Sequence, residues 1–180
     1  VADTNGDEHL YDEALCPHDA DENLLLDDEL REVFSGLPEG VSLTVISDSC
    51  HSGTVTRVAP RPTPDDRRRR FLNPKLLGRK ELEDPFETPV KRKVKYPQSE
   101  MREILLSGCT DKEYSYDAKI DGTYHGAMSH YALQAIREAD YRITYAQLRT
   151  RVNYLLDQAG YPQHPQLEGS RENKQRQIFS

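Results

Sequence analysis

A short apolar run at residues 43–46 leads directly into the polar hexapeptide Asp-Ser-Cys-His-Ser-Gly at residues 48–53. An apolar run bounded by polar and turn-forming residues is typical of a buried strand, and open α/β folds place their sites at the carboxyl ends of such strands. The thiol of Cys50 is therefore expected at one edge of a sheet, where it is placed to act as a nucleophile. A free cysteine is more often a small buried residue, but Asp48 and His51 are unfavourable neighbours for a core position.

The segments around this run predict alternating helices and strands. Acidic residues open a segment at 27–37 whose apolar side chains recur every three or four positions, and Pro38 ends it. A second apolar run at 104–107 also ends in a polar segment, Gly-Cys-Thr-Asp at 108–111. The other predicted elements are helices at 127–139 and 145–159 and a last strand at 176–179. This alternation predicts an α/β fold with a mostly parallel central sheet flanked by helices.

The length and composition limit the class of protein. A chain of 180 residues is sufficient for one ordinary domain. Its 3 cysteines are too few and too scattered for a disulfide framework or a zinc site. No stretch approaches the about 18 apolar residues that cross a membrane, and no signal peptide is recognised, so a cytoplasmic location is expected. Val1 is not an initiator methionine, which is consistent with a start inside a longer protein.

Charge is strongly segregated along the chain, whose net charge is -7. Residues 1–50 hold 14 acids and one base, whereas residues 57–95 hold 13 bases and 6 acids. The basic segment, residues 57–97, also contains 7 of the 11 prolines and shows no helical or strand period. It is predicted to be an exposed linker. Its run of four arginines at 67–70 could bind nucleic acid, but the absence of interleaved aromatic residues disfavours that interpretation.

A cysteine nucleophile requires a base, which is usually a histidine from another part of the fold. His51 is a poor base for Cys50 because adjacent residues of an extended chain point to opposite sides. The other histidines stay open as alternatives, since none lies in a motif that marks a base: His9, His18, His125, His130 and His164.

Three separated sets of residues resemble the metacaspases and their prokaryotic relatives, the orthocaspases, in the caspase-like clan of cysteine peptidases. The first is the cysteine motif at 48–54. The second, at 27–30 and 37–44, is similar to the family's segment before that cysteine. The third is similar to the family's small-subunit region and comprises residues 106–111, 117–118 and 121–127. Because the motifs occur in the family's order, the resemblance covers most of the chain outside the basic segment.

This resemblance implies a caspase-like fold and a peptidase that cleaves protein substrates after arginine or lysine. The implied organisation is a C-terminal part of the large-subunit region at 1–56, a linker at 57–97 and a small-subunit region at 98–180. Cys50 would form the acyl-enzyme, and Asp48 and Asp111 would bind the basic side chain of the substrate. A carboxylate that faces a guanidinium forms a strong charge-assisted contact. A role for Asp48 in a turn or as a helix cap is the alternative.

The histidine of the family is expected outside this chain. In caspase-like enzymes it lies about 50 residues before the cysteine, which places it at or just before Val1. In the family it belongs to a Ser-Gly-His-Gly segment, and that segment does not occur here. The N-terminal strands of the sheet and the base are therefore expected in a preceding part of the same protein, and the chain alone is expected to be inactive.

The chemistry implied by the resemblance requires no cofactor, and calcium is a candidate activator. The family contributes calcium ligands where this chain has Asp27 and Asp28, and clustered carboxylates suit hard cations. Arg57 lies where the family often has a further aspartate, which argues against a calcium site.

The family's linker is often cut by the enzyme itself after basic residues. The candidate positions for such cleavage are Arg61, Arg67, Arg68, Arg69, Arg70 and Lys93. Two rival functions stay open, a catalytically inactive caspase-like interaction module and a calcium-binding scaffold. The calcium-binding scaffold rests only on the acidic residues 1–50.

Overall fold

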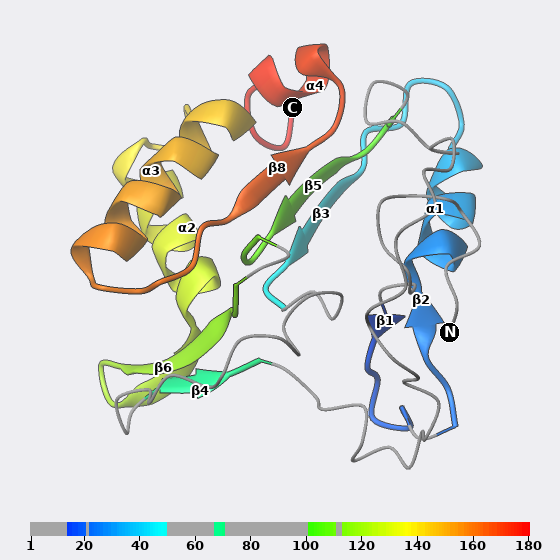
Figure 1. Cartoon of the computed structure of the whole chain (residues 1–180). Coiled ribbons are helices and arrows are strands. Elements are labelled where there is room, and N and C mark those ends of the chain that lie inside the picture. The colour runs from blue at the N-terminus through cyan, green and yellow to red at the C-terminus, as the bar shows by residue number, and fades with distance from the viewer. Residues whose placement is uncertain (1–13, 21, 50–66, 71–100, 111–112) are drawn as a thin grey trace, which may run out of the picture.

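The computed structural model describes residues 14–20, 22–49, 67–70, 101–110 and 113–180, which form three sheets and four helices (Figure 1). The strands are β1 (Ala14–Leu15), β2 (Leu25–Leu26), β3 (Thr44–Ser47), β4 (Arg67–Arg69), β5 (Ile104–Ser107), β6 (Tyr116–Ile120), β7 (Thr123–Gly126) and β8 (Gln166–Glu168). The helices are α1 (Asp27–Ser35), α2 (Ala127–Glu138), α3 (Tyr145–Gln158) and α4 (Arg171–Gln175).

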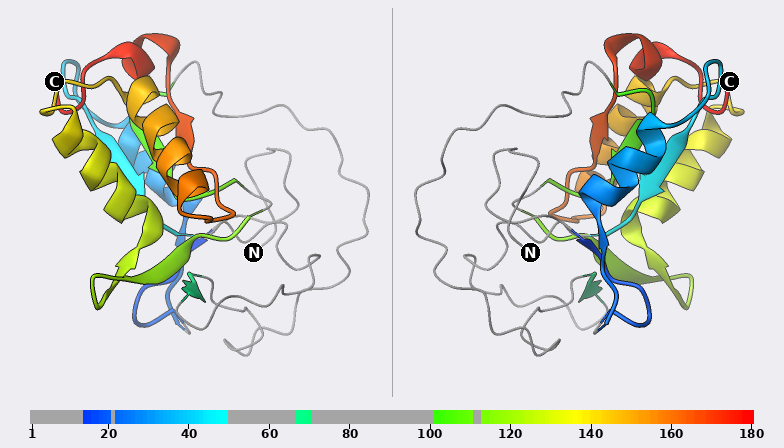
Figure 2. Two further views of the ribbon diagram at one scale, coloured as in Figure 1. Left: turned by 90° about the vertical axis from the view of Figure 1, so that its left-hand side faces the viewer. Right: turned by 90° about the vertical axis from the view of Figure 1, so that its right-hand side faces the viewer.

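The central sheet has the strand order β3-β5-β8 and carries helices on both faces (Figures 1 and 2). Ile104 and Leu106 of β5 point into the core that α2 and α3 cover. Leu105 lies on the other face, where it lines an apolar pocket with Leu30 and Phe34 of α1. The alternation along β5 therefore explains why its first three residues are all apolar, as in strands buried on both faces.

The main core lies between the central sheet and α2 and α3. Its buried residues are Ile104, Leu106, Tyr116, Ala118, Ala127, Met128, Ala132, Ala135, Ile136, Ile143, Tyr145, Leu148, Val152, Leu156, Tyr161 and Ile178. The predicted helices at 127–139 and 145–159 are confirmed as α2 and α3. Thr144 caps α3 and forms a capping box with Gln147, as the sequence predicts. No helix in the described ranges is long and apolar enough to span a lipid bilayer.

The second sheet, β4-β6-β7, is entirely antiparallel. β6 and β7 form a hairpin whose two turn residues, Asp121 and Gly122, have φ values of 51° and 83°. An Asp-Gly pair suits this turn, since both positions require the left-handed region. Sequence analysis did not predict the hairpin, although the Asp-Gly signal was present.

Three expectations for the chain need correction. The last strand is Gln166–Glu168 rather than 176–179. This strand pairs antiparallel with β5, whereas β3 and β5 pair in parallel, so the described central sheet is mixed. At 176–179, Gln177 forms a single bridge to Thr144 and Ile178 is buried in the core. Within the basic segment, Arg67–Arg69 form β4 instead of an exposed linker, because β6 supplies the strand partner.

Candidate substrate-binding site

The carboxyl ends of β3 and β5 meet at one edge of the central sheet. Their parallel register pairs Ser47 with Ser107, so the residues that follow each strand lie close together. After β5, Cys109 is buried and its Sγ lies 3.9 Å from the carbonyl oxygen of Ser49. After β3, the chain passes through Asp48 and Ser49. Cys50 comes next and lies outside the described residues.

The Asp48 side chain occupies a closed position, with 4% of its surface exposed. Its Oδ1 accepts a hydrogen bond from the Ser115 hydroxyl at 2.5 Å, and its Oδ2 accepts one from the Ser129 backbone N–H at 2.9 Å. Ser129 belongs to the first turn of α2, where the unpaired N–H groups and the helix dipole favour a negative charge. Asp48 thus acts as a helix cap from a distant segment, which was the alternative role considered for it.

Two glycines leave room for this carboxylate. A Cβ at Gly126, the N-cap of α2, would lie 2.0 Å from Asp48 Oδ2 and 2.9 Å from Arg70 Cζ. A Cβ at Gly108 would lie 3.1 Å from Asp48 Oδ1 and 2.7 Å from Ser115 Oγ. The backbones of α2 and of the segment after β5 therefore approach Asp48 too closely for any side chain.

The guanidinium of Arg70 completes the site. Its Nε donates to Asp117 Oδ1 at 2.7 Å, and its Nη1 donates to the Asp48 carbonyl at 2.6 Å. The same Nη1 lies 3.8 Å from the Asp48 carboxylate. We call the space bounded by Asp48, Asp117 and Gly126 the acidic recess. It holds a side chain of the basic segment directly after β4.

The chain can now be compared with known proteins. A family model described as the caspase domain matches residues 2–175. The chain belongs to the caspase domain family. This assignment confirms the resemblance to caspase-like cysteine peptidases and the predicted caspase-like α/β fold.

The similar curated proteins are metacaspases. Metacaspase-5 of Trypanosoma cruzi (strain CL Brener) is 31% identical over 173 residues, which are 91% of this chain and 36% of that protein. Metacaspase-1 of Arabidopsis thaliana is 32% identical over 164 residues, which are 80% of this chain and 37% of that protein. This caspase domain chain thus spans well under half the length of these two relatives.

A solved structure supports the same fold. Protein GSU0716 from Geobacter sulfurreducens has a TM-score of 0.61 to this chain, with 22% sequence identity over 94% of this chain and 62% of that one. At this identity the likeness concerns the fold alone.

The histidines of this caspase domain fall into three groups. His125 and His130, with ring centroids 5.9 Å apart, line a hollow together with Arg70 and Ser129. His164 Nδ1 lies 2.6 Å from Glu113 Oε1, and this hydrogen bond raises the pKa of the imidazole. His9 and His51 lie outside the described residues, and His18 lies between β1 and β2.

The remaining predicted site residues are not brought to the acidic recess in the described ranges. Asp111, Arg61 and Lys93 lie outside them. Asp27 and Asp28 begin α1. Within the described residues, no three or more His, Cys, Asp or Glu side chains gather as metal ligands, and the calcium site stays a prediction.

Sequence reasoning missed two members of the site. Asp117 was recognised only as part of a family motif, yet its carboxylate accepts a 2.7 Å hydrogen bond from Arg70 Nε. Ser115, which donates to Asp48, carried no signal at all. Asp117 lies in β6 and Ser115 directly precedes it, and the pairing of β6 with β4 brings both near the basic segment.

Proposed function

We propose that this protein is a cysteine endopeptidase that cleaves after arginine or lysine, with Cys50 as nucleophile. One observation carries the proposal: the acidic recess beside the cysteine motif holds the guanidinium of Arg70 against two acids. Cys50 follows Asp48 by two residues in the sequence, and in this proposal a basic side chain bound in the recess presents its own carbonyl carbon to the thiol. Arg70 is an internal stand-in for the arginine of a substrate.

The proposed chemistry has two steps. In the first, the Cys50 thiolate attacks the carbonyl carbon of the bound arginine, the C–N bond to the next residue breaks, and the amine leaves with the proton that the histidine took from the thiol. In the second, water attacks the thioester, the C–S bond breaks, and the proton of the water returns through the same histidine to the thiolate. We place this histidine in sequence that precedes Val1, as the family resemblance implies.

The contacts of Arg70 support a preference for arginine over lysine before the cleaved bond. They also support a cut within the chain itself. The Arg70 contacts use Nε for Asp117 and Nη1 for the Asp48 carbonyl, and an ammonium group cannot reach both in this planar arrangement. Because Arg70 already lies in the recess, we propose that the bond between Arg70 and Phe71 is the position of self-cleavage within the basic segment.

The test uses the full-length protein and a fluorogenic peptide that ends in arginine. The intact protein should release the fluorophore, and Cys50→Ala should abolish release, whereas Cys16→Ala, at an exposed cysteine, should not change it. Release that survives Cys50→Ala, or no release by the intact protein, would refute the peptidase.

Self-cleavage is tested separately by mass spectrometry of the purified protein. Arg70→Gln should remove the fragment that ends at Arg70, while Arg171→Gln on α4, an equal loss of charge at an exposed position, should leave it. An inactive caspase-like module is the alternative, in which the bridge from Arg70 to Asp48 and Asp117 is a permanent structural contact. That alternative predicts an uncut chain with no peptide cleavage.

A further inference from the structure

The four arginines at 67–70 lie along β6 as an added strand. The register pairs Arg67 with Ala118, Arg68 with Asp117 and Arg69 with Tyr116. The Arg70 N–H continues this ladder by donating to the Ser115 carbonyl at 2.9 Å. Strand addition of this kind is a general mode of peptide recognition, in which the main chain supplies affinity and side-chain pockets supply specificity.

Arg67 is the arginine farthest from the recess, and its side chain lies in a pocket of its own. Its guanidinium lies 4.2 Å from the ring centroid of Tyr161. It also donates from Nη1 to the Gly160 carbonyl at 2.6 Å and from Nη2 to the Ala159 carbonyl at 3.3 Å. These carbonyls follow the last turn of α3, where the helix dipole favours a cation. The pocket combines an aromatic face with a negative helix end.

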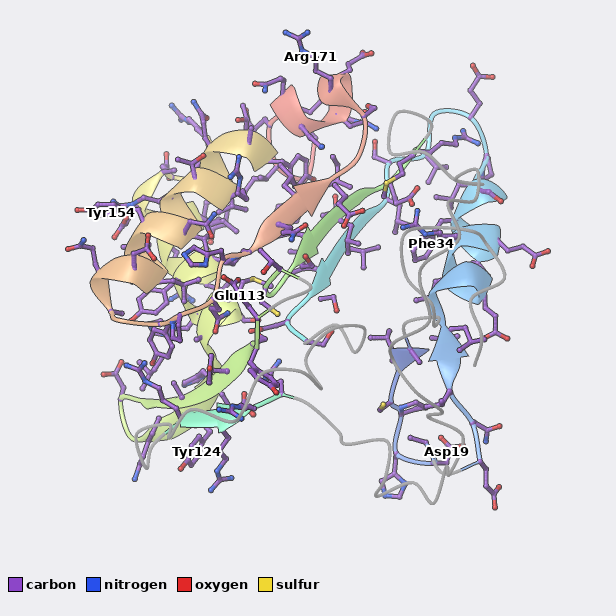
Figure 3. All side chains as sticks on the ribbon, viewed as in Figure 1. Asp19, Phe34, Glu113, Tyr124, Tyr154 and Arg171 are labelled. Atoms are coloured by element: carbon purple, nitrogen blue, oxygen red, sulfur yellow. The ribbon has the colours of Figure 1, made fainter. Side chains whose placement is uncertain are left out.

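The two arginines between also contact tyrosines. Arg68 lies 4.1 Å from the ring centroid of Tyr124 on β7, which pairs with β6 on the side opposite β4 (Figure 3). Arg69 lies 4.4 Å from the ring centroid of Tyr114, which precedes β6. Cation–π contacts of this quality occur about once per 70–80 residues in proteins, whereas here three consecutive arginines each have one. The three tyrosines come from different segments, so the aromatic groups form a row only in the folded chain.

We propose that this surface is an extended binding groove that selects a basic residue at each of the three positions before the arginine in the acidic recess. The substrate class is then a polybasic peptide, of which residues 67–70 are the internal example. Tyr114, Tyr124 and Tyr161 are the specificity-determining residues for the first, second and third positions before that arginine. This proposal depends on the proposed function at one point only: the peptidase assignment determines which arginine precedes the cleaved bond.

The groove is tested by peptide binding, which does not depend on catalysis. In the full-length protein, Cys50→Ala prevents turnover, and Arg67→Gly, Arg68→Ser, Arg69→Gly and Arg70→Ser empty the groove. Should this exchange unfold the protein, the four arginines are changed to glutamine instead, which keeps part of the aliphatic stem and a polar end and removes the charge. Fluorescence anisotropy then compares labelled Arg-Arg-Arg-Arg with Gly-Gly-Gly-Arg, and we expect the first to bind at least about tenfold more tightly.

Single-position peptides assign each tyrosine. Tyr161→Leu should weaken Arg-Gly-Gly-Arg by about two- to fivefold and leave Gly-Gly-Arg-Arg unchanged, and Tyr114→Leu should do the reverse. Tyr124→Leu should affect only Gly-Arg-Gly-Arg. The matched control is Tyr154→Leu, on the outer side of α3 and away from the groove (Figure 3), which should change none of them. These changes keep the charge of the protein, so general attraction between a basic peptide and an acidic chain cannot produce the pattern.

Equal affinity for Arg-Arg-Arg-Arg and Gly-Gly-Gly-Arg would overturn the groove, as would tyrosine variants that weaken all peptides alike. Either result leaves the peptidase proposal intact if the unmodified protein still cleaves after arginine. Conversely, selective binding of the polybasic peptide by a protein that cleaves nothing would support the groove and refute the peptidase.

Discussion

Replacing Gly126 with alanine would place a methyl group inside the acidic recess. The added Cβ would lie 2.0 Å from Asp48 Oδ2, 2.8 Å from Asp48 Cγ and 2.9 Å from Arg70 Cζ. The backbone at Gly126 has φ −61° and ψ 126°, which alanine adopts without strain. The whole effect of the substitution therefore comes from the collision with Asp48.

The magnitude follows from the contacts that must break. Asp48 is enclosed by Ser115 and Ser129 and has little room to move away. Loss of a hydrogen bond to a charged group costs about 1.5–3 kcal/mol, and overpacking of a filled site costs about 1–3 kcal/mol. Because the two effects overlap, we expect the free energy of unfolding to fall by about 2–4 kcal/mol.

Two measurements check this prediction. Urea denaturation of Gly126→Ala gives the loss of stability, and cleavage of an arginine peptide by the full-length variant should fall by at least about tenfold. Gly36→Ala is the control, since a Cβ there meets nothing closer than 3.5 Å. Wild-type stability and cleavage in Gly126→Ala would show that the Asp48 carboxylate does not lie against α2, and the account of the recess would be wrong.

Three further predictions concern neighbouring contacts. Asp117→Asn should lower kcat/KM for arginine peptides by about tenfold and for lysine peptides much less, because only arginine supplies the Nε donor; equal losses in paired peptide assays would contradict this. Thr144→Ala should reduce the free energy of unfolding by about 1 kcal/mol in urea, because it removes the cap of α3; an unchanged midpoint would refute the cap. The hydrogen bond to Glu113 raises the pKa of His164, so its stabilising effect is full below the ordinary histidine pKa of about 6.5 and is lost as pH rises through the raised value. His164→Gln should abolish that part of the pH dependence in urea titrations, with the exposed His18→Gln as control, and an unchanged pH profile would contradict the assignment.

Local patterns were sufficient to predict the elements whose stability is local. The apolar stripe and the capping box of Thr144 and Gln147 located α3, and the two apolar runs located β3 and β5. These patterns depend on residues within one turn or one strand of each other. The family motifs also led to Asp48, whose role in substrate binding stays a prediction.

β4 could not be predicted in the same way, because arginine runs carry no strand pattern. Arg67–Arg69 become a strand only where β6 provides the backbone partners and distant tyrosines cover the side chains. The partner of Arg67, Tyr161, lies far along the chain after α3, so no window of sequence contains both. The predicted strand at 176–179 was wrong for a related reason: Ile178 is buried in the core, but Gln166–Glu168 form the strand that pairs with β5 in the central sheet.

The contacts of Asp48 explain how one recess can hold an internal arginine and still receive another. A buried carboxylate is costly unless it is hydrogen-bonded, and here Ser115 and Ser129 satisfy it independently of Arg70. Arg70 adds an ion pair at 3.8 Å rather than a short contact to that carboxylate, and its side chain is 35% exposed. Its departure therefore leaves the buried Asp48 carboxylate hydrogen-bonded, and the N-terminus of α2 keeps the negative charge in place. The recess stays preorganised for the next basic side chain because its own hydrogen bonds hold Asp48 in position.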